Sequence, residues 1–157
     1  MRFVLEKPGK RRLVVFGVNP STADNKVADR TMGKVMGFAE RNGFDGFVML
    51  NLYPQRCTNS DNLDKELNVD LHKRNLEEIR NVISEMEKPV VLLAFGDTIR
   101  KRHYLKNCLR DIVNIVKESN PQWKQIGHPT ALGNPRHPSR AGYVGFSDFN
   151  VEQYLSL

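Results

Sequence analysis

The chain has 157 residues, of which 39% are hydrophobic and 27% charged, and we expect residues 1–157 to form one globular domain with a single adequate core. No apolar run approaches the length of a membrane span and no signal-peptide pattern opens the chain, which predicts a soluble, cytoplasmic protein with no membrane partner. The net charge of +6 favours polyanionic partners without proving them.

Four apolar segments of strand length alternate with segments of helical periodicity. The predicted strands are 12–16, 46–51, 89–95 and 123–127. The predicted helices are 31–42, 69–87, an apolar stripe at 105–116 and a short helix near 151–155. This alternation predicts an α/β domain in which a four-stranded parallel sheet is flanked by helices.

Some smaller features follow from the same pattern. Asp70 is the expected N-cap of the helix at 69–87, and Asp97 or Thr98 that of the helix after Gly96. Two distant cysteines, Cys57 and Cys108, predict free thiols, no metal site and no cofactor. The irregular stretch 127–147 is long for a compact domain, and loops of this kind are often functional.

Each predicted strand is followed by a segment that carries polar residues. These segments are Gly17-Val18-Asn19-Pro20, Asn51-Leu52-Tyr53-Pro54, Phe95-Gly96-Asp97 and His137-Pro138-Ser139. Gly17 permits a sharp turn and Pro20 fixes the direction of exit. Because ligands of open α/β sheets bind at the carboxyl ends of the strands, the segments predict one binding site.

The order of these segments resembles the uracil-DNA glycosylase superfamily. Its members have a Gly-x-(Asp/Asn/Glu)-Pro first motif and an (His/Asn)-Pro-Ser second motif on a four-stranded parallel sheet. The Asn-Pro form of the first motif is most similar to the mismatch-specific thymine/uracil branch. The whole chain most resembles a bacterial and phage domain family of unknown function within or near that superfamily, through Asn-Pro-Ser-Thr-Ala-Asp and Asn-Leu-Tyr. The resemblance covers about residues 12–146.

The resemblance implies a DNA glycosylase-like protein that binds a flipped or single-stranded pyrimidine base and hydrolyses its N-glycosidic bond. The catalytic candidates are Asn19, which would bind the attacking water, and His137, which would donate a hydrogen bond to a base carbonyl. Because an amide is a poor general base, the reaction should be slow. Asn51 would read one edge of the base, and Tyr53 could stack on it. The remaining residues expected to bind the base are Gly17, Val18 and Pro20.

Hydroxyl and basic side chains near these segments are candidates for contacts with a nucleic-acid backbone. They are Ser21, Arg100, Lys101, Arg136, Ser139 and Arg140. The expected partner is nucleic acid, with DNA favoured over RNA, or a nucleotide. Asp24, Asp29 and Thr31 either line the pocket or cap the next helix.

One departure from the family pattern concerns the wedge residue. Glycosylases that act on duplex DNA usually carry a bulky side chain after the second motif, which fills the space left by the flipped base. This chain continues Arg140-Ala141-Gly142-Tyr143 and has no leucine there. Arg140 or Tyr143 could replace the wedge, or the substrate could be single-stranded nucleic acid or a free nucleotide.

Each candidate also has a plain structural explanation. Asn19 could satisfy backbone groups of its turn, Asn51 could cap one, and His137 could be an exposed loop residue. The alternative function is a non-catalytic module that binds a nucleotide or nucleic acid in the same cleft. A Rossmann-like nucleotide domain is disfavoured, because no Gly-x-Gly-x-x-Gly or phosphate-loop motif follows a predicted strand.

Overall fold

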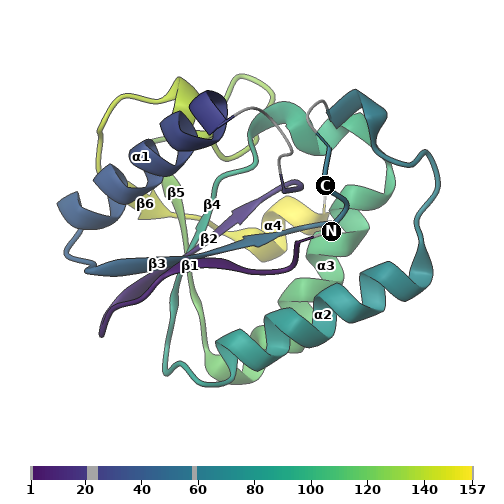
Figure 1. The fold of residues 1–157 in the computed structure, drawn as a ribbon, viewed down its shortest axis with the longest axis horizontal. Helices are drawn as coiled ribbons and strands as arrows, with labels where there is room; N and C mark the ends of the chain where they lie inside the picture. Colours follow the sequence, from purple (N-terminus) through teal and green to yellow (C-terminus); the bar gives the residue numbers. More distant parts are fainter. Residues whose placement is uncertain (1, 21–24, 58–59, 157) are drawn as a thin grey trace.

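A single sheet organises the computed structural model, which describes residues 2–20, 25–57 and 60–156 (Figure 1). The sheet has six strands in the order β1-β3-β2-β4-β5-β6. Its parallel centre consists of β3 (Gly46–Asn51), β2 (Arg12–Gly17), β4 (Val90–Leu93) and β5 (Gln122–Ile126). The predicted parallel sheet is therefore correct for the centre of a mixed, mostly parallel sheet in a single α/β domain.

The sequence pattern does not predict the two edge strands. β1 (Leu5–Lys7) runs antiparallel to β3, and β6 (Phe146–Asp148) runs antiparallel to β5. Each has three residues, which is too short to show the alternation that marks a strand. As a consequence, the prediction of only four strands, all parallel, is wrong at both edges.

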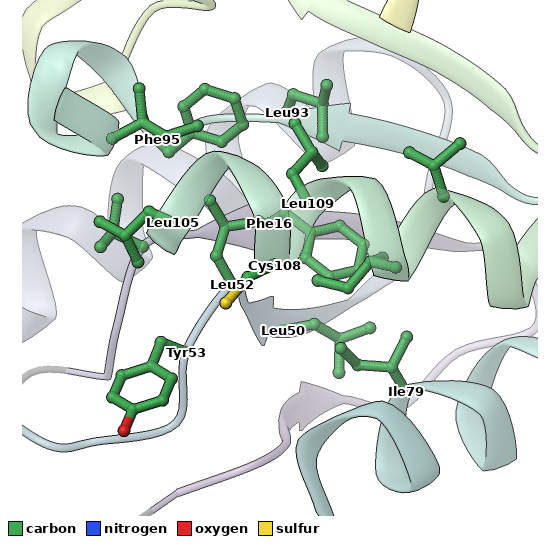
Figure 2. Close-up of a cluster of buried hydrophobic side chains, with 14 of the residues drawn as sticks. Phe16, Leu50, Leu52, Tyr53, Ile79, Leu93, Phe95, Leu105, Cys108 and Leu109 are labelled. Carbon is green, nitrogen blue, oxygen red and sulfur yellow. The ribbon is translucent and has the colours of Figure 1, made fainter. Parts of the chain in front are cut away.

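Helices cover both faces of the sheet (Figure 1). α1 (Asn25–Arg41) lies on one face, whereas α2 (Val69–Ile83), α3 (Tyr104–Val116) and α4 (Val151–Ser156) lie on the other. Alternate side chains of a strand point to opposite faces. Leu13 and Val15 of β2 accordingly pack under α1, and Phe16 packs in the larger cluster with α2 and α3 (Figure 2).

The short elements and caps differ from those predicted. Asn68, not Asp70, is the N-cap of α2, and its side chain accepts a hydrogen bond from the Leu71 N–H. Asp97 and Thr98 lie in a 3-10 helix and do not cap α3, which begins at Tyr104. The 3-10 helices of the described residues are η1 (Ser60–Asn62), η2 (Gly96–Lys101), η3 (Lys117–Ser119) and η4 (Pro138–Arg140).

Two of the simpler predictions can be checked directly. Cys57 and Cys108 are free thiols, as predicted, and Cys108 is buried on the inner face of α3. Within the described ranges, no helix is long and apolar enough to cross a membrane.

The connections create a topological switch point between β2 and β4. From β2 the chain passes through α1 to β3 on one side, and from β4 it passes through α3 to β5 on the other. The segments that leave β2 and β4 therefore part at the carboxyl ends of these strands. In open α/β sheets, ligands bind in the crevice that forms at such a point.

The close approach of β1 and β3 can be tested at Gly46. A Cβ atom at Gly46 would lie 2.5 Å from the Lys7 carbonyl oxygen and 2.9 Å from that of Pro8. We expect Gly46→Ala to lower the free energy of unfolding by about 1–3 kcal/mol, as overpacking usually does. Gly33→Ala in α1 is the control, because no atom lies within 4 Å of its added Cβ and alanine favours a helix. If denaturant unfolding shows that Gly46→Ala and Gly33→Ala change the free energy of unfolding equally, the close packing of β1 on β3 is contradicted.

Candidate functional site

A cavity of about 200 Å³, here called the central cavity, lies at the carboxyl ends of the central strands. Six of the predicted site residues line it: Gly17, Val18, Asn19, Pro20, Asn51 and His137. Thr31 of α1 also lines it. Residues that the sequence analysis did not place there are Arg2, Leu5, Met32, Met49, Phe95 and Thr98. The structure thus brings together the three polar residues expected to act on a base.

The Asn19 amide has a defined orientation. Its Nδ2 donates hydrogen bonds to the carbonyl oxygens of Pro20 (3.2 Å) and Cys57 (3.3 Å). Both partners are acceptors, so the amide nitrogen must face them and Oδ1 is left as an acceptor. Asn19 therefore satisfies backbone groups of its turn, and it also lines the central cavity with Oδ1 as its remaining acceptor.

Asn51 lies at the end of β3 with only 5% of its surface exposed. Its side-chain amide makes no hydrogen bond within the described part of the chain, and it lines the cavity. A Cβ atom at residue 17 would lie 3.2 Å from Asn51 Oδ1, so Gly17 gives this amide its space. One acceptor and two donors are thereby available to a ligand.

A buried polar residue of α2 holds the backbone beneath Asn51. Asn75 Nδ2 donates to the carbonyl oxygen of Asn51 at 2.9 Å and to that of Leu52 at 3.4 Å. Sequence analysis missed Asn75, although an asparagine among the apolar positions of a predicted helix is the signal that could have found it.

The hydrogen bonds of His137 define its tautomer. The backbone N–H of Ser139 donates to His137 Nδ1 at 3.1 Å, and this requires an unprotonated Nδ1. Burial lowers the pKa of His137, and the positive charge of Arg140 lowers it further. The neutral imidazole therefore carries its proton on Nε2, which is a hydrogen-bond donor for a ligand.

A second hollow, here called the basic groove, meets the central cavity at Thr98 and His137. Four residues predicted to contact a nucleic-acid backbone line it: Lys101, Arg136, Ser139 and Arg140. Arg100 is exposed on η2 and lines neither hollow. Other residues of η2, such as Thr98 and Lys101, line the groove instead. Ser21 and Asp24 lie outside the described residues, as does the side chain of Asp29.

The cations of the basic groove differ in their partners. Lys101 forms an ion pair with Asp61 at 2.8 Å. Arg136 donates to the carbonyl oxygens of His128 and Pro129, which holds its guanidinium in place. Arg140 is exposed, and its guanidinium has no hydrogen bond or ion pair within the described ranges.

The loop that carries His137 is fixed to the end of β4 by Asp97. Asp97 Oδ1 accepts hydrogen bonds from Thr130 Oγ1 at 2.7 Å and from Asn134 Nδ2 at 2.8 Å. These two bonds hold the pKa of Asp97 below its usual value. Asn134 is buried, and its Oδ1 accepts from the Tyr154 hydroxyl at 2.6 Å. The network links η2, which follows β4, to the loop and to α4.

Gly96 lets this loop approach the strand end. Its φ of +60° lies in the left-handed region, and an added Cβ would lie 3.1 Å from the Cβ of His137. A larger residue at position 96 would therefore displace the histidine.

Two aromatic residues considered for contacts with a base are engaged elsewhere in the protein. Tyr53 belongs to the cluster of buried side chains in Figure 2. It is fully buried against Tyr104, and its hydroxyl accepts a hydrogen bond from the Asn68 N–H, so it does not stack on a ligand. Tyr143 packs on Phe38 of α1, with the Arg41 guanidinium 3.7 Å from its ring centre. Because these contacts hold the ring of Tyr143 against α1, it is not available to fill the space left by a flipped base. Of the two residues considered for that role, Arg140 is the one whose side chain makes no such contacts in the described residues.

Comparison with known proteins assigns the chain to a family. A model described as "Protein of unknown function (DUF1643)" matches residues 2–139, and the chain belongs to that family. No curated protein and no solved structure matches the chain. The matched range contains every residue that lines the central cavity.

The protonation state of His137 can be measured by NMR. We expect its pKa to lie below 6.5, the ordinary value, and Arg140→Ala to raise it by removing a nearby positive charge. Between the folded and unfolded pKa values the unfolded state binds more protons, so this histidine makes the free energy of unfolding fall as the pH decreases through that window. A pKa above 6.5, or a neutral ring protonated on Nδ1, would contradict the geometry described.

Proposed function

We propose that this member of the family binds a single pyrimidine base in the central cavity and hydrolyses its N-glycosidic bond, while the attached phosphates lie in the basic groove. The observation that carries the proposal is the convergence of Asn19, Asn51 and His137 on one cavity at the switch point. The resemblance of the motifs to the uracil-DNA glycosylase superfamily supports the same assignment.

The size of the central cavity suits one ring. A volume of about 200 Å³ is small among ligand pockets, which typically have about 300–1,000 Å³, and it favours one pyrimidine ring over a base pair. The base would have to enter unpaired, from a single strand, a flipped position or a free nucleotide.

The two catalytic candidates would act on opposite sides of the breaking bond. Asn19 Oδ1 would accept a hydrogen bond from a water that attacks C1′ of the sugar. The bonding electrons would leave with the base, and His137 Nε2–H would stabilise the resulting negative charge on a base oxygen. The base would finally take up the proton that the attacking water releases.

Asn51 would choose the base. An oxo-pyrimidine presents a ring N–H beside a carbonyl oxygen, and one amide can accept from the first and donate to the second. Because Asn51 is almost buried, a base with the wrong pattern would leave its polar atoms unpaired, which costs about 1–3 kcal/mol per group.

A non-catalytic module that binds a nucleotide or nucleic acid is the second candidate. One observation favours it: among the residues that the structure describes, no carboxylate lines the central cavity, so a strong general base is missing. A protein that binds pyrimidine nucleotides through Asn51 and His137 and releases no base would be this module.

Cleavage of oligonucleotides separates the two candidates. We expect release of uracil or a related pyrimidine from single strands, and a rate about 10²-fold lower in Asn19→Ala and in His137→Ala, with binding largely retained. Asn51→Ala should instead relax or abolish the choice of base. His128→Ala and Asn114→Ala are matched controls, because both side chains are exposed and line neither the cavity nor the groove. The appearance of abasic sites measures the rate.

If wild-type protein releases no base from any pyrimidine substrate, hydrolysis is contradicted. Equal rates in the wild type, Asn19→Ala and His137→Ala would contradict the assignment of the site.

The salt dependence of binding tests the basic groove. Each phosphate neutralised by a cation releases counterions, so affinity for a single-stranded oligonucleotide should fall steeply between about 50 and 200 mM salt. Arg140→Ala should weaken binding to all sequences alike and reduce the salt slope by about one. Arg80→Ala is the control, since Arg80 lies on α2, away from both the cavity and the groove. Fluorescence anisotropy that shows no salt dependence would contradict a groove that binds phosphates.

A further inference from the structure

One cation lines the central cavity itself. Arg2 is half-buried there beside mainly apolar side chains that include Leu5 and Met49. Its backbone N–H donates to the Pro54 carbonyl oxygen at 3.3 Å, which holds the N-terminal segment over the chain that leaves β3. None of the roles assigned above uses this residue.

The unpredicted edge strand explains why Arg2 lies at the cavity. β1 runs antiparallel to β3, so the residues that precede β1 lie at the carboxyl end of β3. β1 and β5 stand on opposite sides of β3, β2 and β4 in the sheet. Arg2 therefore approaches the cavity from the side of Asn51, and His137, which follows β5, approaches from the other.

Within the part of the chain that the structure describes, the charge of Arg2 has no counterpart. Its guanidinium has no hydrogen bond or ion pair, and no aspartate or glutamate lines the cavity among the residues that the structure describes. The guanidinium of Arg102, in contrast, donates to several carbonyl oxygens, and that of Arg136 to two. A guanidinium stays charged at any physiological pH, and its planar fork matches a carboxylate.

We infer that Arg2 is a specificity-determining residue, which binds an anionic substituent, a carboxylate, on the ring carbon next to the pyrimidine edge that Asn51 contacts. The inference rests on the proposed function, since it requires a base in the central cavity. His137 would hold the carbonyl beside the sugar, so Arg2, on the opposite side, meets the part of the ring farthest from the sugar. Bidentate pairing there would neutralise a charge that has no partner among the described residues.

Three ligands test the inference by calorimetry: uracil, and the nearly isosteric pair uracil-5-carboxylate and uracil-5-carboxamide. The carboxamide keeps the size of the carboxylate and lacks its charge. Hydrogen bonds to a charged group contribute about 1.5–3 kcal/mol, so we expect the carboxylate to bind roughly 10- to 100-fold more tightly than the carboxamide. Arg2→Met should abolish this ratio, Arg2→Lys should retain part of it, and Arg80→Met should leave it unchanged.

Three results would overturn the inference without touching the proposed function. The first is no preference for the carboxylate in the wild type, and the second is the same preference in an Arg2→Met variant that thermal unfolding shows to be folded. The third is weaker binding of deoxyuridine monophosphate, but not of deoxyuridine, by Arg2→Met, which would assign Arg2 to the sugar phosphate. If uracil still binds in the wild type and Asn51→Ala loses the preference for uracil over other pyrimidines, the proposed base site stands despite these results. If no pyrimidine binds at all, the proposed function fails and the inference fails with it.

Discussion

Main-chain hydrogen bonds beyond the ends of the strands hold the central cavity in shape. The N–H groups of Leu52 and Tyr53 donate to the carbonyl oxygens of Gly17 and Val18, both at 2.9 Å, so the segments after β2 and β3 stay paired past their strands. The Cys57 N–H donates to the Pro20 carbonyl oxygen at 3.1 Å, beside the bonds made by the Asn19 amide. These bonds leave little freedom to the two asparagines. On the other side of the switch point, the Asp97 network fixes His137 in a comparable way.

The chemistry of the cavity follows from how its polar atoms are already used. The nitrogen of Asn19 and Nδ1 of His137 bind the protein, so their free atoms are an acceptor and a donor respectively. Asn51 offers both kinds of atom, and Arg2 offers donors only. A ligand that complements this set has several acceptor oxygens and at least one N–H, as an oxo-pyrimidine does. Apolar neighbours such as Met32 and Phe95 limit the water that could compete for these atoms.

Sequence patterns could predict the parts of the site that follow a strand. Asn19 and Asn51 are visible because polar residues at the end of a predicted strand lie at a known edge of the sheet. His137 lies within the irregular stretch 127–147 and is visible through the His-Pro-Ser motif of the resemblance. Tyr53 comes from the same segment, but the chain turns beneath α3 there, and a turn has no periodicity that tells a buried from an exposed side chain. The contribution of Arg2 depends on β1, whose three residues carry no strand signal. The Asp97 network joins residues far apart in the chain, and no local pattern connects them.

The most direct test of the base site is a crystal structure of the protein with a single-stranded trinucleotide. Its central nucleotide carries uracil on a modified sugar whose N-glycosidic bond resists hydrolysis. We expect the uracil ring in the central cavity, with one edge on the Asn51 amide and a carbonyl oxygen accepting from His137 Nε2, and the phosphates along Arg136 and Arg140. A ring bound elsewhere, such as the hollow between the ends of α2 and α3 lined by Arg80 and Asn114, would contradict the base site.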